Sequence, residues 1–411
     1  KIIRVIGDYD VDGICASYIL KKGLSVCGAN VDIVIPHRIK DGYGINEQLI
    51  QDAFEDGIDM IVTCDNGIAA FSQIEYAMSL GMTCIVTDHH EVPYEMVEGG
   101  KQYILPPADA VIDPKQEDCP YPYKNICGAV VAWKVVNKLW EQINVSEEEK
   151  HEILEFAGIA TVCDVMELLD ENRIIVKEAL KSMSHSANLG LRSLIRVHDL
   201  NPANLSAYHI GFVLGPCFNA TGRLDTAART IELLECKSER EGILAAAELK
   251  RLNESRKEMT EKGVEEAILK IQEEELEKDY IMVVYLPDCH ESLAGIIAGR
   301  LREKYYKPVL VLTKAEDCVK GSGRSIETYH MYEELNKCKE LLLKFGGHKL
   351  AAGLSLEEKN IELFREMLNE NCTLTEEDME EKVLIDVPMP MSYVTEDFLK
   401  ELELLEPFGT G

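Results

Sequence analysis

The sequence GDYDVDG at residues 7–13 decides the fold of the first half of the chain. It follows an apolar, β-branched run at residues 2–6, which predicts a buried strand. Similar short runs, separated by helical patterns, predict further strands at residues 31–35, 60–62, 82–86 and 111–112. Strands that alternate with helices in this way indicate an α/β domain with a doubly wound, mainly parallel sheet.

Two more polar clusters follow predicted strands: CDNG at residues 64–67 and DHH at residues 88–90. Parallel strands share one carboxyl edge, where ligands bind, so we expect the three clusters to converge in space. Clustered carboxylates repel one another unless a cation or a proton intervenes. Helix-capping aspartates and buried histidines are the structural alternative, but three clusters on neighbouring strand ends favour a metal site. Mixed oxygen and imidazole ligands suit Mn²⁺ or Mg²⁺.

Asp164 is the candidate for a fourth acid of a two-metal site, because it interrupts an apolar helical run at residues 157–165. A buried carboxylate is costly unless it is paired or metal-bound. Taken alone, Asp164 fits an N-cap equally well. Both interpretations stay open from the residues.

The second half of the chain predicts a smaller α/β domain. Helical patterns dominate from residue 147, and the Glu-, Lys-, Ala- and Leu-rich stretch at residues 240–279 predicts one or two long connecting helices. Strands at 280–286 and 309–313 are expected to flank a helix at 292–304. The expected boundaries are a catalytic domain at 1–239, a connecting helix at 240–279, a substrate-binding domain at 280–372, and a final segment at 373–411.

The net charge of −30, from 43 basic and 73 acidic residues, argues against contact with nucleic acid unless the charge is distributed unevenly. Acid is concentrated at residues 265–279 and 376–381, whereas the glycine-rich motifs carry cations. Bound divalent metals would also reverse the local sign at an acidic cluster. The overall charge therefore leaves a nucleic-acid substrate possible.

The thirteen cysteines are odd in number and include no C-x-x-C pair, so we expect reduced thiols. No apolar run approaches the roughly 20 residues of a membrane span, and the first residues do not resemble a secretion leader. We therefore expect a cytoplasmic protein without a membrane partner.

Seven segments resemble, in order, the motifs of the RecJ single-stranded-DNA exonucleases in the DHH phosphoesterase superfamily. The two segments after residue 319 resemble the DHH-associated domain. The segments are GDYDVDG at 7–13, CDNG at 64–67, DHH at 88–90, CDV at 163–165, NATGR at 219–223, KGSGRS at 320–325 and FGGHKLAAG at 345–353.

The resemblance implies a site for two Mn²⁺ or Mg²⁺ ions, with Asp65 as a bridge between them. The implied metal ligands are Asp8, Asp10, Asp65, His89 and Asp164. His90 resembles the family's second histidine, which positions or stabilises the scissile phosphate, and the implied catalytic set is His90, Asp65 and Asp12. Asp12 resembles an additional acid of RecJ.

The resemblance also implies residues that bind the substrate. Arg38, which precedes DGYG at 41–44, resembles an arginine near the 5′ phosphate. The other implied residues are Arg223, His290, Ser322, Arg324, Gly346, Gly347 and His348. His290 and Arg223 could instead be structural. The chain departs from the family after His290, where ESLAG at 291–295 replaces a glycine-rich run.

The resemblance implies a two-metal 5′→3′ exonuclease that releases 5′-mononucleotides from single-stranded DNA in recombination and repair. The implied partners are single-stranded DNA, a helicase and a single-strand-binding protein, with the chain a monomer. One alternative is a DHH phosphodiesterase that acts on nanoRNA or cyclic dinucleotides. Another is a catalytically inactive replication scaffold. The strand-like run at 383–387 is expected to begin an oligonucleotide-binding domain of which the rest is cut away.

Overall fold

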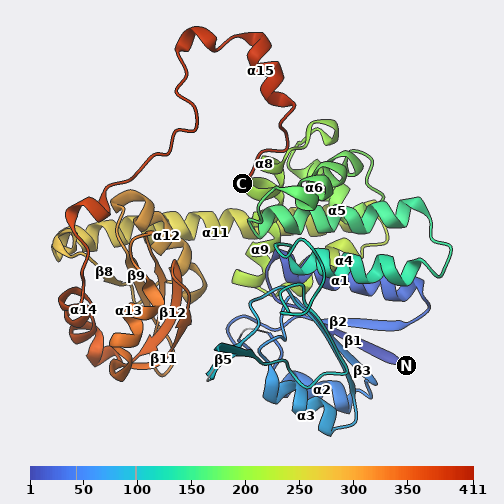
Figure 1. Ribbon diagram of the computed structural model, residues 1–411, viewed down its shortest axis with the longest axis horizontal. Coiled ribbons are helices and arrows are strands. Elements are labelled where there is room, and N and C mark those ends of the chain that lie inside the picture. Colours follow the sequence, from blue (N-terminus) through green and yellow to red (C-terminus); the bar gives the residue numbers. More distant parts are fainter. Residues whose placement is uncertain (43, 98–99) are drawn as a thin grey trace. The chain divides into compact units, whose positions relative to one another are not determined.

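The computed structural model describes residues 1–42, 44–97 and 100–411 and divides the chain into two compact units (Figure 1). The first unit is Lys1–Asn253 together with Ser392–Gly411, and the second is Glu254–Met391. The long helix α11 (Glu239–Glu273) is a single helix that contributes residues to both units. It is the expected helical connector.

The first unit contains a five-stranded parallel sheet in the order β2-β1-β3-β4-β7. Its strands lie where the apolar runs predict them, which confirms the fold class. Their bounds are β1 Ile2–Ile6, β2 Asn30–Val34, β3 Met60–Cys64, β4 Thr83–Thr87 and β7 Ala110–Ile112.

Helices cover both faces of this sheet. Helices α2 (Glu47–Glu55) and α3 (Phe71–Ser79) bury one face in a cluster that contains Ile6. Helices α1 (Val11–Val26) and α4 (Gly128–Trp140) belong to the larger cluster on the other face.

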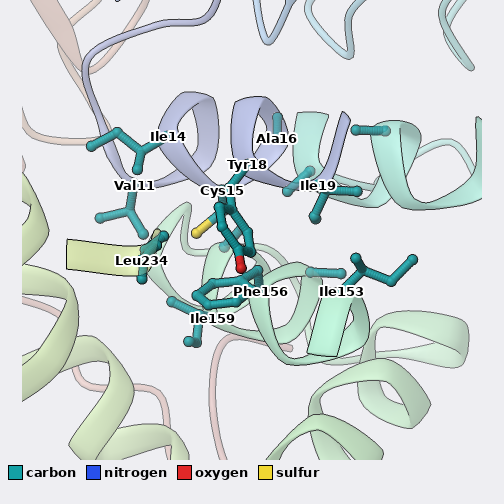
Figure 2. Packing of buried hydrophobic residues seen from close by; sticks show 14 of the residues in the cluster. Val11, Ile14, Cys15, Ala16, Tyr18, Ile19, Ile153, Phe156, Ile159 and Leu234 are labelled. Carbon is teal, nitrogen blue, oxygen red and sulfur yellow. The ribbon is translucent and has the colours of Figure 1, made fainter. Parts of the chain in front are cut away.

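Helix α5 (Glu147–Cys163) packs on the outer side of α1, as Figure 2 shows. The rings of Tyr18 and Phe156 meet edge to face with centroids 4.7 Å apart. Both rings are buried, so this contact fixes α1, the helix that follows the first acidic motif, against the helical layer.

The α- and π-helices between α5 and α11 fit the helical pattern that the sequence predicts from residue 147. They are α6 Asp170–Met183, α7 Leu189–Val197, α8 Ala207–His209, the π-helix Ile210–Leu214, α9 Gly215–Leu224 and α10 Ala228–Leu234. No helix among the described residues is long and apolar enough to cross a membrane. All thirteen cysteines are free thiols, as expected.

The second unit contains a mixed five-stranded sheet in the order β11-β12-β10-β9-β8, so the expected smaller α/β domain is confirmed. Helix α12 (Ala294–Tyr305) joins β8 to β9, close to the bounds that the sequence predicts. The strands are β8 Met282–Tyr285, β9 Val309–Lys314, β10 Val319–Arg324, β11 Leu342–Gly347 and β12 Ala351–Leu356, and the other helices are α13 Met331–Lys337 and α14 Ile361–Glu370.

The strand expected at residues 383–387 is wrong, because these residues adopt no regular structure. A strand needs a partner for its backbone hydrogen bonds. Here Leu384 remains 89% exposed. Farther on, α15 (Glu396–Glu403) belongs to the first unit, and the Leu168 N–H donates to the Thr410 carbonyl over 2.7 Å. The oligonucleotide-binding domain itself stays a prediction.

Candidate functional site

The carboxyl ends of β1, β3 and β4 bring the three acidic and histidine clusters of the first unit together. Three sets of side chains each place their ligand atoms within 4.8 Å of one another. The sets are Asp8–Asp10–Asp65, Asp65–His89–His90 and Asp12–His89–Asp164. Because Asp65 and His89 each belong to two sets, all seven predicted acids and histidines form one continuous cluster.

Local backbone geometry orients the first two acidic motifs. Asp10 is the N-cap of α1, and its carboxylate accepts a hydrogen bond from the Gly13 N–H over 3.1 Å. Asp65 has φ 57°, a left-handed conformation that is rare and strained for a residue with a side chain. Its N–H nevertheless donates to the Thr87 carbonyl over 3.1 Å, which ties the turn to the neighbouring strand. Strain of this kind is typical of functional sites.

His89 lies at the centre of the cluster. Its Nε2 atom is 3.1 Å from the nearest oxygen of Asp65, 3.6 Å from that of Asp12 and 3.9 Å from that of Asp164. Burial lowers the pKa of His89, which favours the neutral imidazole that can ligate a metal.

Burial and mutual repulsion both act on the carboxylates of the cluster. Burial, followed by the charge of neighbouring aspartates, raises the pKa of Asp8, Asp10 and Asp65. The same two causes raise the pKa of Asp164 to about 8. Asp8 is only 2% exposed, and its Oδ1 atom is buried without a hydrogen-bond partner. Such a cluster is stable if cations bind it, and its oxygen and imidazole atoms fit Mn²⁺ or Mg²⁺.

Asp88 organises the histidine pair, a function that the sequence analysis did not assign to it. Its carboxylate accepts from the Ile68 N–H over 2.9 Å and the His89 N–H over 2.8 Å. It also lies 2.7 Å from His90 Nδ1. Burial lowers the pKa of His90, but the hydrogen bond and charge of Asp88 outweigh burial and raise it to about 9. The signal was present in the DHH triplet itself, since a histidine ligand commonly has a carboxylate partner.

Asp12 has a structural role that its place in the motif does not reveal. Helix α4 begins at Gly128 without a side-chain cap from its own N-cap residue, Cys127. The Asp12 carboxylate supplies that cap, accepting from the N–H groups of Gly128 over 2.6 Å and Ala129 over 2.7 Å. Asp12 thus fixes α4 against the metal cluster while it remains near His89.

Asp164 is neither inside a helix nor an N-cap. It is the C-cap of α5, and Val165 after it has φ 56°. The left-handed residue ends the helix and leaves the Asp164 side chain at the cluster. The N-cap alternative is therefore wrong.

Two predicted substrate-binding arginines belong to the first unit. The Arg38 guanidinium carbon lies 4.6 Å from the centroid of the Tyr9 ring, inside the first motif. Arg223 is in the last turn of α9. Burial raises the pKa of Tyr9, and the positive charge of Arg223 opposes this shift. The backbone of Gly222 also lies against Tyr9, since a Cβ at that glycine would be 2.5 Å from the Tyr9 carbonyl oxygen. Tyr43 in the DGYG segment lies outside the described residues.

The second unit brings several other predicted residues to one face of its sheet. Lys320, Ser322 and Arg324 alternate along β10 with buried residues, so all three point to the same side. Arg324 lies over the start of α12, where a Cβ at Gly295 would be 3.0 Å from its Nη2 atom. Lys320 pairs with Glu291 over 2.8 Å, next to His290.

The glycine-rich strand β11 continues this face. Ser322 is opposite Gly353, and Gly353 is opposite Gly346, so three small residues form a row across the sheet. The His348 N–H donates to the Ala351 carbonyl over 2.8 Å, which closes the β11–β12 connection. The row gives an open surface on which a phosphate could approach the backbone.

His290 is positioned by its own segment. Its Nδ1 atom lies 2.7 Å from the Ser292 hydroxyl, and it caps the short helix Glu291–Leu293. This contact gives His290 a structural task, so a substrate-binding role for it stays a prediction.

Comparisons with known proteins agree on one family. The family model "DHH family, N-terminal domain" matches residues 2–162, and the DHHA1 domain model matches residues 278–373. The single-stranded-DNA-specific exonuclease RecJ of Bacillus subtilis is 36% identical over 413 residues, covering 99% of this chain and 50% of that protein. The RecJ of Escherichia coli is 34% identical and covers 99% of this chain and 73% of that protein.

Solved structures give the same likeness. A manganese-bound exonuclease RecJ has a TM-score of 0.77 at 30% identity and covers 90% of this chain and 89% of that chain. RecJ of Thermus thermophilus with Mn²⁺ has a TM-score of 0.85 at 29% identity and covers the whole of this chain. The present chain spans half the length of the Bacillus relative and 57% of the Thermus structure.

Proposed function

The chain belongs to the RecJ family of DHH proteins, and from this premise we propose that it is a two-metal phosphodiesterase that degrades single-stranded DNA. The observation that supports this most directly is the cluster of Asp8, Asp10, Asp65, His89 and Asp164 at one sheet edge. Relatives named as single-stranded-DNA-specific exonucleases align with 99% of the chain. The RecJ structures that resemble it are described with Mn²⁺ or Mg²⁺.

The five residues would hold the two ions, with Asp65 between them. Two ions roughly 3.5–4 Å apart supply an activated water and neutralise the leaving oxygen of an in-line displacement. The buried, partnerless Oδ1 atom of Asp8 supports a ligand role for this residue. Asp12 acts through α4 and keeps the cluster compact.

His90 is suited to contact the scissile phosphate. Its side chain is 46% exposed, and Asp88 holds its ring through Nδ1. In the metal-free protein the pKa of His90 is raised to about 9, so the ring is a cation near neutral pH and can donate from Nε2 to a phosphate oxygen. Asp88 is thus a positioning residue for His90.

We propose that each unit has its own set of polar residues that bind phosphates of the substrate. Arg38 and Arg223 would contact the phosphate backbone beside the metal cluster, because both act on Tyr9 in the first motif. Ser322, Arg324, Gly346, Gly347 and His348 would bind phosphate on the sheet of the second unit. His290 would lie at the border of that surface.

The resemblance assigns the enzyme 5′→3′ polarity and 5′-mononucleotide products in DNA recombination and repair. It also suggests a cytoplasmic monomer that works with a helicase and a single-strand-binding protein. Residues 1–239 would then form the catalytic domain, 240–279 the connector and 280–372 the substrate-binding domain.

The test is a Mn²⁺-titrated digestion of single-stranded DNA labelled at its 5′ or 3′ end. Duplex DNA, short RNA and cyclic dinucleotides are digested in parallel. We expect 5′-mononucleotides from the single strand only, released first from the 5′ end. The variants Asp65→Ala and His90→Ala should reduce the rate at least a hundredfold, whereas Asp118→Ala, at an exposed aspartate, should leave it unchanged.

Each contrary result rejects a different part of the proposal. A preference for dinucleotides would reject the exonuclease. No hydrolysis despite bound Mn²⁺ would favour a scaffold. Asp65→Ala or His90→Ala as active as the parent would reject the site.

A further inference from the structure

The connection between β4 and β7 departs from the pattern of the other crossovers in the first sheet. The earlier connections contain helices α1, α2 and α3, which cover the sheet. Between β4 and β7 the chain instead forms two antiparallel strands, β5 (Tyr94–Val97) and β6 (Gly100–Tyr103). Figure 1 labels β5 in the first unit. We call this pair the β5–β6 ribbon.

The β5–β6 ribbon is exposed on both of its sides. All eight residues of the two strands are exposed. Met96 is 74% exposed, Tyr94 46% and Tyr103 38%. A two-stranded ribbon that buries little apolar surface is only marginally stable in water. Apolar side chains in such an element are therefore better explained by a ligand than by packing.

One side of the ribbon carries its aromatic residues and its cation. Tyr94 pairs with Tyr103 in the register, and their rings meet edge to face with centroids 6.0 Å apart. The Lys101 Nζ atom lies 4.0 Å from the centroid of the Tyr94 ring, which places it on the same side. Side chains alternate along a strand, so Glu95 and Gln102 lie on the opposite side.

The chain connects this aromatic side closely to the metal cluster. Tyr94 is four residues after His90, and four residues span at most about 14 Å. A stacked strand advances about 3.4 Å per nucleotide, so this distance corresponds to roughly four nucleotides.

We propose that Tyr94, Lys101 and Tyr103 bind the bases of the substrate strand a few nucleotides from the scissile phosphate. This inference rests on the proposed function. Tyrosine rings stack on any base, and a nearby lysine attracts the phosphates, which is the usual composition of a single-strand binding surface. The surface does not distinguish DNA from RNA, because every base has a face that can stack.

A single strand fits this surface better than a protein partner does. Protein interfaces place aromatic anchors in a buried core and are depleted in lysine there. Here the lysine lies directly over the tyrosine ring, and the ribbon is continuous in sequence with the proposed catalytic edge.

The experiment measures binding of a fluorescent single strand by anisotropy, with Ca²⁺ in place of Mn²⁺ to prevent cleavage. We expect Tyr94→Ala and Tyr103→Ala each to weaken binding about tenfold and Tyr94→Phe to retain it. Glu95→Ala and Gln102→Ala, on the other side of the same ribbon, are the matched controls and should bind as the parent does. The parent should bind a strand with abasic sites more weakly than an intact strand. On the abasic strand, Tyr94→Ala and the parent should have the same affinity.

A separate measurement keeps this inference distinct from the proposed function. Hydrolysis of bis(p-nitrophenyl) phosphate with Mn²⁺ tests the metal site without any base to stack. If the parent hydrolyses it while both alanine variants bind the strand as the parent does, the ribbon inference is wrong and the function stands. If those variants bind normally but change the sedimentation coefficient, the surface joins copies of the chain and the inference is again wrong. If the parent hydrolyses neither bis(p-nitrophenyl) phosphate nor single-stranded DNA with Mn²⁺, the proposed function fails.

Discussion

The Asp12 carboxylate accepts a hydrogen bond of 2.6 Å from the N–H of Gly128, across 116 positions of the sequence. This bond joins the first turn of α1 to the first turn of α4. A carboxylate at a helix N-terminus is stabilised both by the free N–H groups and by the helix dipole. Gly128 also leaves room for Asp65, because a Cβ at Gly128 would be 2.8 Å from that of Asp65. One helix start therefore supports two acids of the cluster.

Asp12→Ala should destabilise the protein by about 2 kcal/mol, because two buried N–H groups would lose their acceptor. Urea denaturation measured without metal gives this value. Asp12→Asn keeps one acceptor oxygen and should recover about half of the loss. Equal stability of Asp12→Ala and the parent, combined with a large loss of Mn²⁺ affinity, would mean that Asp12 is a metal ligand and not a cap.

Gly128→Ala should weaken Mn²⁺ binding at least tenfold. The added methyl group would lie 2.8 Å from the Asp65 Cβ and 3.0 Å from its Cα, so the backbone of Asp65 must shift. Isothermal titration with Mn²⁺ measures the change. Gly299→Ala is the control. Gly299 lies in a different helix, α12, and a Cβ added there would meet no atom within 4 Å. Unchanged Mn²⁺ affinity in Gly128→Ala would show that the cluster tolerates a displaced Asp65.

The sequence predicted those parts of the fold and the site that depend on local pattern. The apolar runs before Asp8, Asp65 and His89 identify strands, and the shared edge of parallel strands then brings the clusters together. The cap that Asp12 provides for α4 could not be predicted, because its partners are distant in sequence and are backbone groups.

The errors also have physical causes. Helix α5 ends at Asp164 because Val165 adopts a left-handed conformation, which is unusual for a β-branched residue. Residues 383–387 have β-branched side chains but form no strand, since strand formation depends on a pairing partner rather than on composition. The β5–β6 ribbon is not among the predicted elements, although the Gly99-Gly100 dipeptide is a turn signal and Tyr94, Val97 and Tyr103 are strand-forming residues.

Stability should fall as pH rises from about 4.5 to about 7 because of Glu155. This glutamate is 1% exposed, and burial raises its pKa to about 7 although Ser182 and Ser186 donate hydrogen bonds to it. A folded-state pKa above the unfolded value means that the folded protein retains the proton, so the contribution is complete below about pH 4.5 and is lost above about pH 7.

The pH-dependent contribution of Glu155 is about 3 kcal/mol from this shift. Glu155→Gln should remove that part of the pH dependence in urea denaturation between pH 5 and 8. The exposed Glu148→Gln, in the same helix, should keep the slope of the parent. The assignment is wrong if Glu155→Gln and the parent have the same slope.

Removing the metal should have a larger effect at pH 8 than at pH 6. The pKa of Asp164 is raised to about 8, so the metal-free protein retains protons on this carboxyl group at pH 6, and the pKa values of Asp8, Asp10 and Asp65 are shifted in the same direction. Mn²⁺ must displace these protons at pH 6 but meets more charged carboxylates at pH 8. The stabilisation by Mn²⁺, measured as the shift in Tm after EDTA treatment and metal addition, should therefore increase with pH. Between pH 6 and pH 8 the apparent Mn²⁺ affinity of the parent should rise at least tenfold. The affinity of Asp164→Asn should rise less over the same interval, because this variant lacks one titrating acid. An affinity that does not change with pH would mean that the carboxylates are already ionised in the metal-free protein, and that the cluster is solvated more than its burial indicates.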